Sequence, residues 1–326
     1  MSEAGDYDPG PWKGHNFKSA RKQYDVHVGR SYKDAVASKK NPKDMVPGSI
    51  ATDVKAPLVV ACDVTGSMGE SPATIFSKCP YLDLEGKEYL GDDMAISFTA
   101  VGDAYSDQYP LQVRPFVHGL DLKKNLGELV IEGGGGGQRM ESYDLAALYY
   151  ARNVDMPNAI NPIFIFIGDE GLYDFVDKTQ ASTWARTTVT GRLRYKDVLK
   201  ELKRKYAVYC IRQPYHKTGT DKMSADDKVI HKQWESALGA DHMAFLPNAA
   251  RIVDVIFGIL AKETDRIDYF KDEIKGRQTA AQVKTAMKGL KSIHALPDPK
   301  AAKKAKSGKS MIKRDSKAKD SKSLIE

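Results

Sequence analysis

Short apolar runs that stop abruptly at polar residues recur through the middle of this chain. They have the length and the β-branched and aromatic content of buried strands, and they lie at residues 58–62, 94–101, 111–117, 161–168, 207–211 and 243–246. Between them, apolar residues recur at helical spacing, at residues 71–78, 120–131, 142–153, 195–206 and 229–238, and a further helix begins after Asn248. Alternating strands and helices predict an α/β fold with a doubly wound, mostly parallel central sheet and helices on both faces. A short polar loop after residue 101 favours one antiparallel pair.

Two flanking regions differ from this pattern. In the N-terminal region, residues 24–28 alternate like a short strand and residues 31–39 could form two helical turns, but the region is too small for its own core. We expect it to pack on the main domain or on a partner. Residues 277–293 have the spacing of a basic amphipathic helix, which favours docking on the domain over docking on a partner. We therefore divide the chain into an N-terminal arm (1–55), an α/β domain (56–264), a helical extension (265–299) and a basic flexible tail (300–326).

Acidic and hydroxyl side chains follow two of the predicted strands. Asp63 ends the first run and is followed at two-residue intervals by Thr65 and Ser67, and Asp169 ends a later run in the sequence I-G-D-E-G. One or two carboxylates with neutral hydroxyls suit a hard divalent cation, above all Mg²⁺. These residue types are also ordinary turn formers and helix caps, so the first loop alone favours a structural turn. The second carboxylate shifts the balance towards a cation site.

These motifs resemble the metal-ion-dependent adhesion site (MIDAS) of von Willebrand factor type A (vWA) domains, over about residues 56–264. That site reads D-x-S/T-x-S, a later Thr or Ser, and a later Asp, often in T-D-G where this chain has G-D-E-G. The middle hydroxyl is usually a Thr after two glycines. Here its best match is Ser142, and Glu141 is an alternative ligand or a group that supports one. The resemblance thus implies these metal ligands: Asp63, Thr65, Ser67, Ser142 and Asp169.

The resemblance also implies a cation, a partner and a fold. The cation would be Mg²⁺, with Mn²⁺ or Ca²⁺ as alternatives, and one of its positions would accept a Glu or Asp from a protein partner. The vWA, Rossmann-like sheet reverses its strand order between its first strand and the strand that carries the later Asp. Asp63 and Asp169 would therefore be neighbours. No motif places a His, Cys or Lys as a general base or nucleophile, so we assign no catalytic residue and do not expect an enzyme.

Two further segments would lie around such a metal. After Asp169, aromatic residues alternate with basic ones, which is typical of interface anchors but equally of aromatics that pack on their own domain; these residues are Tyr173, Phe175, Lys178, Trp184, Arg186 and Arg192. The glycine run at residues 133–137 does not match a phosphate-binding motif. It favours a loop that rearranges on binding.

The net charge of +7 comes from one end of the chain. Residues 300–326 hold ten Lys and Arg against three Asp and Glu, which accounts for the whole excess. This tail has no aromatic residue and few apolar ones, so we expect it to be disordered alone. It could bind nucleic acid without sequence preference, or an acidic surface. A solubilising terminus explains it equally well.

The sequence also indicates the cellular compartment in which the protein is expected. The first residues do not resemble a signal peptide, and no apolar run approaches the ~18 residues of a membrane span. Cys62, Cys79 and Cys210 form no C-x-x-C pair, and two of them lie in apolar runs, where a buried thiol is expected. We predict a cytoplasmic protein, or one in an intracellularly assembled particle such as a virion, with no membrane partner.

The leading functional hypothesis is Mg²⁺-dependent protein binding by a scaffold module in a multiprotein assembly. The sequence does not separate a structural subunit of a particle from an adaptor for an AAA+ ATPase. A second hypothesis is a nucleoprotein component that holds RNA or DNA through residues 300–326. A metal-dependent hydrolase is the least favoured, because no general base is placed by motif.

Overall fold

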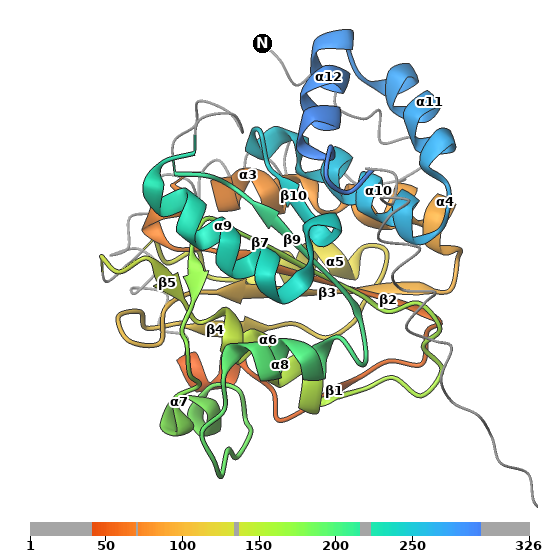
Figure 1. The fold of residues 1–326 in the computed structure, drawn as a ribbon. Helices are drawn as coiled ribbons and strands as arrows, with labels where there is room; N and C mark the ends of the chain where they lie inside the picture. The colour runs from red at the N-terminus through yellow and green to blue at the C-terminus, as the bar shows by residue number, and fades with distance from the viewer. Residues whose placement is uncertain (1–40, 70, 134–136, 216–222, 295–326) are drawn as a thin grey trace, which may run out of the picture. The chain divides into compact units, whose positions relative to one another are not determined.

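The centre of the molecule is a six-stranded sheet, five strands of which are parallel (Figure 1). The computed structural model describes residues 41–69, 71–133, 137–215 and 223–294. Across the sheet, the strands are β10 (Met243–Phe245), β9 (Ala207–Arg212), β7 (Ile163–Gly168), β2 (Ala56–Asp63), β3 (Met94–Val101) and the antiparallel β4 (Leu111–Val113). Helices cover both faces, so the predicted doubly wound α/β fold is confirmed. The strand and helix predicted within residues 24–39, and the basic tail, lie outside the described residues.

The strand order reverses beside β2. From β2 the chain runs to β3 and β4 on one side, and then returns to the other side of β2 to form β7, β9 and β10. Strands β2 and β7 are parallel, with Leu58 opposite Ile163 and Cys62 opposite Ile167. This register brings the carboxyl end of β2, at Asp63, beside the carboxyl end of β7, at Gly168. Ligands of open parallel sheets bind at such a point.

Alternating side chains of β2 point to two separate cores, and all eight residues of the strand are buried. Leu58, Val60 and Cys62 belong to one apolar cluster, and Val59 and Ala61 to the other. The first cluster includes residues of α3 (Ser71–Lys78), α4 (Tyr81–Leu90), α5 (Asp121–Glu128) and α10 (Ile252–Glu263). The second includes residues of α6 (Tyr143–Arg152), α7 (Lys178–Thr183), α8 (Tyr195–Leu202) and α9 (Ala225–Leu238). Burial on both faces explains why β2 is continuously apolar.

Some elements differ from the sequence-based expectation. Helix α4 was not predicted, because Gly86 interrupts its apolar spacing. A Cβ at Gly86 would lie 3.2 Å from the Met94 side chain, so the close packing of this helix on β3 explains the glycine. The strand predicted at 111–117 stops at Val113, two residues before Pro115, and only an isolated bridge joins Val117 to Ile96.

Two short pairs of strands complete the described chain. β1 (Ile50–Ala51) pairs with β6 (Val154–Asp155), so the described end of the N-terminal arm packs on the domain. β5 (Met140–Glu141) pairs with β8 (Gly171–Leu172) at the edge where β2 and β7 end. The three cysteines are free and buried, which includes the two in apolar runs for which burial was expected. Among the described helices, none combines the length and the apolar character that crossing a membrane requires.

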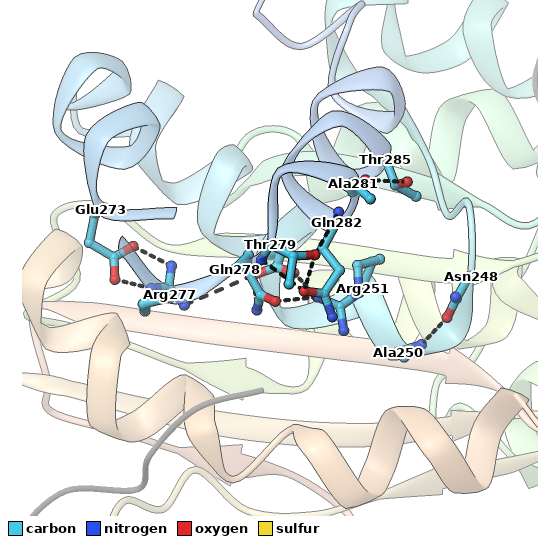
Figure 2. Close-up of polar contacts among 11 residues, drawn as sticks. Asn248, Ala250, Arg251, Glu273, Arg277, Gln278, Thr279, Ala281, Gln282 and Thr285 are labelled. Carbon is cyan, nitrogen blue, oxygen red and sulfur yellow. Dashed lines mark hydrogen bonds and ion pairs between the residues drawn. The ribbon is translucent and has the colours of Figure 1, made fainter. Parts of the chain in front are cut away.

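Helices α11 (Ile267–Arg277) and α12 (Ala280–Gly289) pack on α10, which confirms that the C-terminal helical segment docks on the domain (Figure 1). A Cβ at Gly258 of α10 would lie 2.2 Å from Leu290, so the two segments are in close contact. A buried polar network joins them (Figure 2). In it, Arg251 Nη1 donates to Asp254 Oδ2 at 3.0 Å and to Gln278 Oε1 at 2.7 Å. Thr279 then caps α12 through a capping box.

The docking of this segment should depend on pH through His294. His294 Nε2 lies 2.9 Å from the carbonyl oxygen of Gly258, while Nδ1 is buried without a hydrogen-bond partner. Burial lowers the pKa of His294 below its usual value. The unfolded chain therefore takes up a proton at higher pH than the folded protein, and stability is lost as pH falls below about 6.5.

We expect the contribution of His294 to the free energy of unfolding to fall between pH 7 and pH 5, by about 1.4 kcal/mol for each unit by which the pKa is lowered. Buried carboxyl groups with raised pKa values, such as Glu273, act in the opposite direction, so the measurement is the difference in free energy of unfolding between wild-type protein and His294→Gln, which can still donate to Gly258. In urea titrations, the stability of the wild type relative to this variant should be lower at pH 5 than at pH 7. An unchanged difference would show that His294 does not contribute. His231 has a pKa lowered by burial as well, and acts in the same direction as His294.

Candidate functional site

Four of the five proposed ligands form one chain of hydrogen bonds at the carboxyl edge of the sheet. Asp63 Oδ1 accepts from the backbone N–H of Thr65 at 2.8 Å and from its hydroxyl at 2.6 Å. The hydroxyls of Thr65 and Ser67 are 3.1 Å apart, and Ser67 Oγ donates to Asp169 Oδ1 at 3.1 Å. The turn after β2 thus reaches the turn after β7 across 102 residues of sequence, as the topology predicts.

Ser142 is tied to a different loop. Its hydroxyl accepts from the backbone N–H of Ala104 at 2.9 Å, and its own N–H donates to the carbonyl of Gly102 at 3.1 Å. Among the hydrogen bonds of the described residues, none joins Ser142 to Asp63 or Asp169. The structure therefore brings Asp63, Thr65, Ser67 and Asp169 into one network and places Ser142 in contact with the loop that follows β3.

Tyr143, at the start of α6, makes the contact with Asp63 that Ser142 does not. Its buried hydroxyl donates to Asp63 Oδ2 at 2.6 Å. The hydroxyl passes over Gly168, where an added Cβ would lie only 1.8 Å away. Sequence reasoning missed this residue. The glycine directly before Asp169 was the available signal, because glycine inside a strand often marks a close approach.

Glu141 and Glu170 add two carboxyl groups beside this network. The pairing of β5 with β8 brings Glu141 close to the turn that holds Glu170. Helix α9 fixes that turn, since Trp234 Nε1 donates to the carbonyl of Glu170 at 2.8 Å. Tyr215 OH donates to Glu170 Oε1 at 2.5 Å. The sequence pointed to Glu141 as an alternative ligand, but did not indicate Glu170.

Burial raises the pKa values of the four carboxyl groups. Burial and the neighbouring charge of Asp63 raise the pKa of Asp169 to about 9, and burial raises the pKa of Asp63. Burial and Asp63 raise the pKa of Glu141 to about 12, and burial raises that of Glu170 to about 7, with Asp63 a further contribution. Each group resists ionisation chiefly because it is buried, and repulsion from acidic neighbours adds to this effect. A bound cation would oppose this repulsion.

The residues present fit a hard cation. Three carboxyl oxygens of the cluster, Asp169 Oδ2, Glu141 Oε2 and Glu170 Oε2, are buried without a hydrogen-bond partner, although buried polar atoms are normally satisfied. Among the described residues, no three or more His, Cys, Asp or Glu side chains are arranged to hold a metal. A cation here would therefore need the hydroxyls of Thr65 and Ser67 beside the two aspartates. Such an oxygen-only set suits Mg²⁺ better than zinc.

A buried ion pair holds the turn that contains Asp169. Arg212, the last residue of β9, donates to the carbonyl oxygen of Asp169 and, at 3.2 Å, to Asp227 Oδ1 of α9. Both side chains of the pair are fully buried. Asp227 also accepts from the backbone N–H of Tyr215 at 3.1 Å and from Ser224 Oγ at 2.8 Å. Arg212 therefore links the site to α9.

The aromatic residues after Asp169 contact their own domain. Tyr173 OH donates to Asp103 Oδ1 at 2.9 Å, and its ring lies 4.8 Å from that of Tyr105. The Arg192 guanidinium stacks 3.6 Å from the centre of the Phe175 ring, and Trp184 packs against the second apolar cluster. Tyr105 nevertheless remains more than half exposed. The glycine run predicted to rearrange lies largely outside the described residues.

Comparisons with known proteins yielded distant structural similarities. No family model matches the chain, and no curated protein matches it. A pilus adhesin, SpaC from Lactobacillus rhamnosus GG in its open conformation, has a TM-score of 0.46 at 9% identity, over 69% of this chain and 31% of the adhesin. Proximal thread matrix protein 1 from the mussel byssus has a TM-score of 0.41 at 13% identity, over 66% of this chain and 48% of that protein. The chain thus spans less than half the length of these structures.

Proposed function

We propose that the chain is a Mg²⁺-dependent protein-binding module whose cation is held at the carboxyl edge of the sheet. The observation that carries the proposal is the hydrogen-bonded network of Asp63, Thr65, Ser67 and Asp169, which joins two strands at the point where the sheet reverses. The three buried, unpartnered carboxyl oxygens beside it support a missing positive charge. The vWA-like order of these residues in the sequence supports the same assignment.

The residues that would hold the cation supply two carboxylates and two hydroxyls. When bound, the cation would act as an electrophile for an oxygen from outside the chain. Asp63 and Asp169 would hold the cation by their charge, and Thr65 and Ser67 would contribute neutral oxygens. Ser67 is exposed, so the network is open to solvent on that side.

The partner we propose offers a Glu or Asp side chain, as the MIDAS-like residue pattern implies. In this role the chain would serve a multiprotein assembly as a scaffold or adaptor. The carboxyl and hydroxyl groups of the candidate site are oxygen donors for a cation, which suits the binding role proposed here.

The proposal predicts a saturable response to divalent cations. Mg²⁺ added to chelator-treated protein should raise its melting temperature, and Mn²⁺ should bind with a measurable water-proton relaxation enhancement. Ser67→Ala removes one neutral oxygen and should weaken Mn²⁺ binding by about 10- to 150-fold, since a charge-assisted contact contributes about 1.5–3 kcal/mol. Acetate should lower the relaxation enhancement of the Mn²⁺ complex by displacing water, and acetamide should not.

Ser77→Ala is the matched control. Ser77 lies in α3, close in sequence to the site, and its hydroxyl donates to the carbonyl oxygen of Thr74 at 2.7 Å. This variant should bind Mn²⁺ like the wild type. Wild-type protein that shows neither a thermal shift nor Mn²⁺ binding would refute the proposed cation site. Binding without discrimination between acetate and acetamide would refute the carboxylate-bearing partner.

A further inference from the structure

We infer that Tyr143 is a positioning residue of the cation site and acts through Asp63, in place of a direct hydroxyl ligand from the segment that contains Ser142. The inference rests on the function proposed above. It assigns a role to a residue that lies next to the predicted ligand Ser142 and that the MIDAS-like pattern leaves without one.

The hydrogen bonds of Asp63 show how Tyr143 would act. Oδ1 accepts two hydrogen bonds, both from Thr65, and Oδ2 accepts one, from the Tyr143 hydroxyl at 2.6 Å. An ionised carboxylate has about four acceptor positions, so Asp63 retains about one of them, on Oδ2. Tyr143 thus fixes the rotation of the carboxyl group and the direction in which its remaining acceptor position points.

The surroundings of Tyr143 hold its ring rigidly. The ring makes edge contacts with Phe166, at 6.0 Å between ring centres, and with Trp234, at 5.3 Å. Gly168 provides the space for the hydroxyl, because any side chain there would overlap it. Two features separated by 25 residues of sequence, an aromatic hydroxyl and a missing side chain, therefore serve one contact with Asp63.

Ser142 has a different task in the same segment. Its backbone and its hydroxyl both bind the loop after β3, at Gly102 and Ala104. Two adjacent residues thus make different contacts: Ser142 binds the loop after β3, and Tyr143 binds Asp63. A residue that orients a metal ligand through a hydrogen bond typically changes metal affinity by about 10- to 100-fold when it is replaced.

Tyr143→Phe is the decisive variant. It keeps the ring and its packing on Phe166 and Trp234 but removes the O–H donor. We expect Mn²⁺ affinity, measured by calorimetry on the full chain, to fall by about 10- to 100-fold. The melting temperature in chelator should fall as well, because the buried Asp63 Oδ2 loses its hydrogen-bond donor, so the affinity is the deciding measurement. A purely structural role for Tyr143 would move the melting temperature and leave the affinity unchanged.

Two further variants separate the alternatives. Tyr149→Phe is the matched control, because Tyr149 lies in the same helix and its buried hydroxyl has no hydrogen-bond partner in the structure. It should bind Mn²⁺ like the wild type. Ser142→Ala should lower the melting temperature in chelator, since Ala104 N–H loses its acceptor, with Mn²⁺ affinity within about twofold of the wild type.

The outcomes are distinguishable from those of the proposed function. If wild-type protein binds no Mn²⁺, the cation site itself is wrong. If the wild type binds Mn²⁺ and Tyr143→Phe binds it equally well, the cation site stands and the role of Tyr143 is refuted. A loss of affinity in Ser142→Ala as large as that in Tyr143→Phe would identify Ser142 as a ligand and overturn the division of roles.

Discussion

Replacing Arg212 with Met is expected to lower the free energy of unfolding by about 3–5 kcal/mol, because it leaves a buried charge without its partner. Arg212 and Asp227 are both fully buried, and the guanidinium also binds the carbonyl oxygen of Asp169. Methionine fills similar space but supplies no donor. Asp227 would keep its bonds from Tyr215 and Ser224, so we expect destabilisation rather than complete unfolding. Urea titration followed by circular dichroism measures the change.

Arg152→Met provides the control for losing an arginine. Arg152 forms a bidentate pair with Glu201 at 2.8 and 2.9 Å, but the two side chains are 32% and 29% exposed. Exposed pairs contribute at most about 1 kcal/mol. The double variant Arg212→Met with Asp227→Leu removes both buried charges, and should recover part of the loss. If the two arginine variants lose the same free energy of unfolding, burial does not determine how much these ion pairs contribute to stability.

Replacing Asp169 with Asn is expected to remove the response to Mg²⁺ and to leave the metal-free protein as stable as the wild type or more so. Two unit charges 4 Å apart interact by about 4 kcal/mol at an effective dielectric constant of about 20, and Mg²⁺ carries two charges, so losing one carboxylate should weaken cation binding by at least about a thousandfold. Without the cation, the same carboxylate is buried beside Asp63 and Glu170 with one oxygen unpartnered. Asn removes that repulsion at nearly constant volume.

The measurement is the melting temperature in chelator and in excess Mg²⁺. Asp174→Asn is the matched control, since Asp174 lies five residues further along the same segment and its side chain is exposed. It should keep the full Mg²⁺-dependent shift. If Asp169→Asn protein still gains stability with Mg²⁺, the stabilising cation binds at another site. One that is strongly destabilised in chelator would show that Asp169 has a structural role independent of metal.

The fold was predictable from sequence where the buried part of an element is mostly apolar. The expected ranges 71–78 and 94–101 coincide with α3 and β3, because β3 is buried along its length and α3 buries Ile75 and Phe76. Helix α4 was not predicted, and α11 was predicted only as part of the helical extension at 265–299. Their spacing is interrupted by glycine and charge, and they form because α10 provides an apolar surface for them, which is a tertiary effect.

The candidate site was predictable as far as its proposed ligands follow strand ends. The contact between Ser67 and Asp169 follows from the strand order, which the vWA resemblance supplied. Tyr143 and Arg212 could not be assigned from sequence, since each reaches the site from an element whose position depends on long-range packing. Glu170 directly follows Asp169, but its contact with Tyr215, 45 residues away, could not be predicted. Ser142 matched a motif position, yet its hydroxyl binds a neighbouring loop. Spacing identifies which residues are near a site, but not which atom each of them contacts.

The reversal of strand order beside β2 has a consequence for biosynthesis. Asp63 meets Asp169 only after β7 has been added to the sheet, and a ribosome makes about a hundred further residues between the two. Pairing between such distant segments is a slow, non-local step of folding. A nascent chain would therefore bind the proposed cation only after that step, and ion uptake in a refolding experiment would report when the two halves of the sheet join.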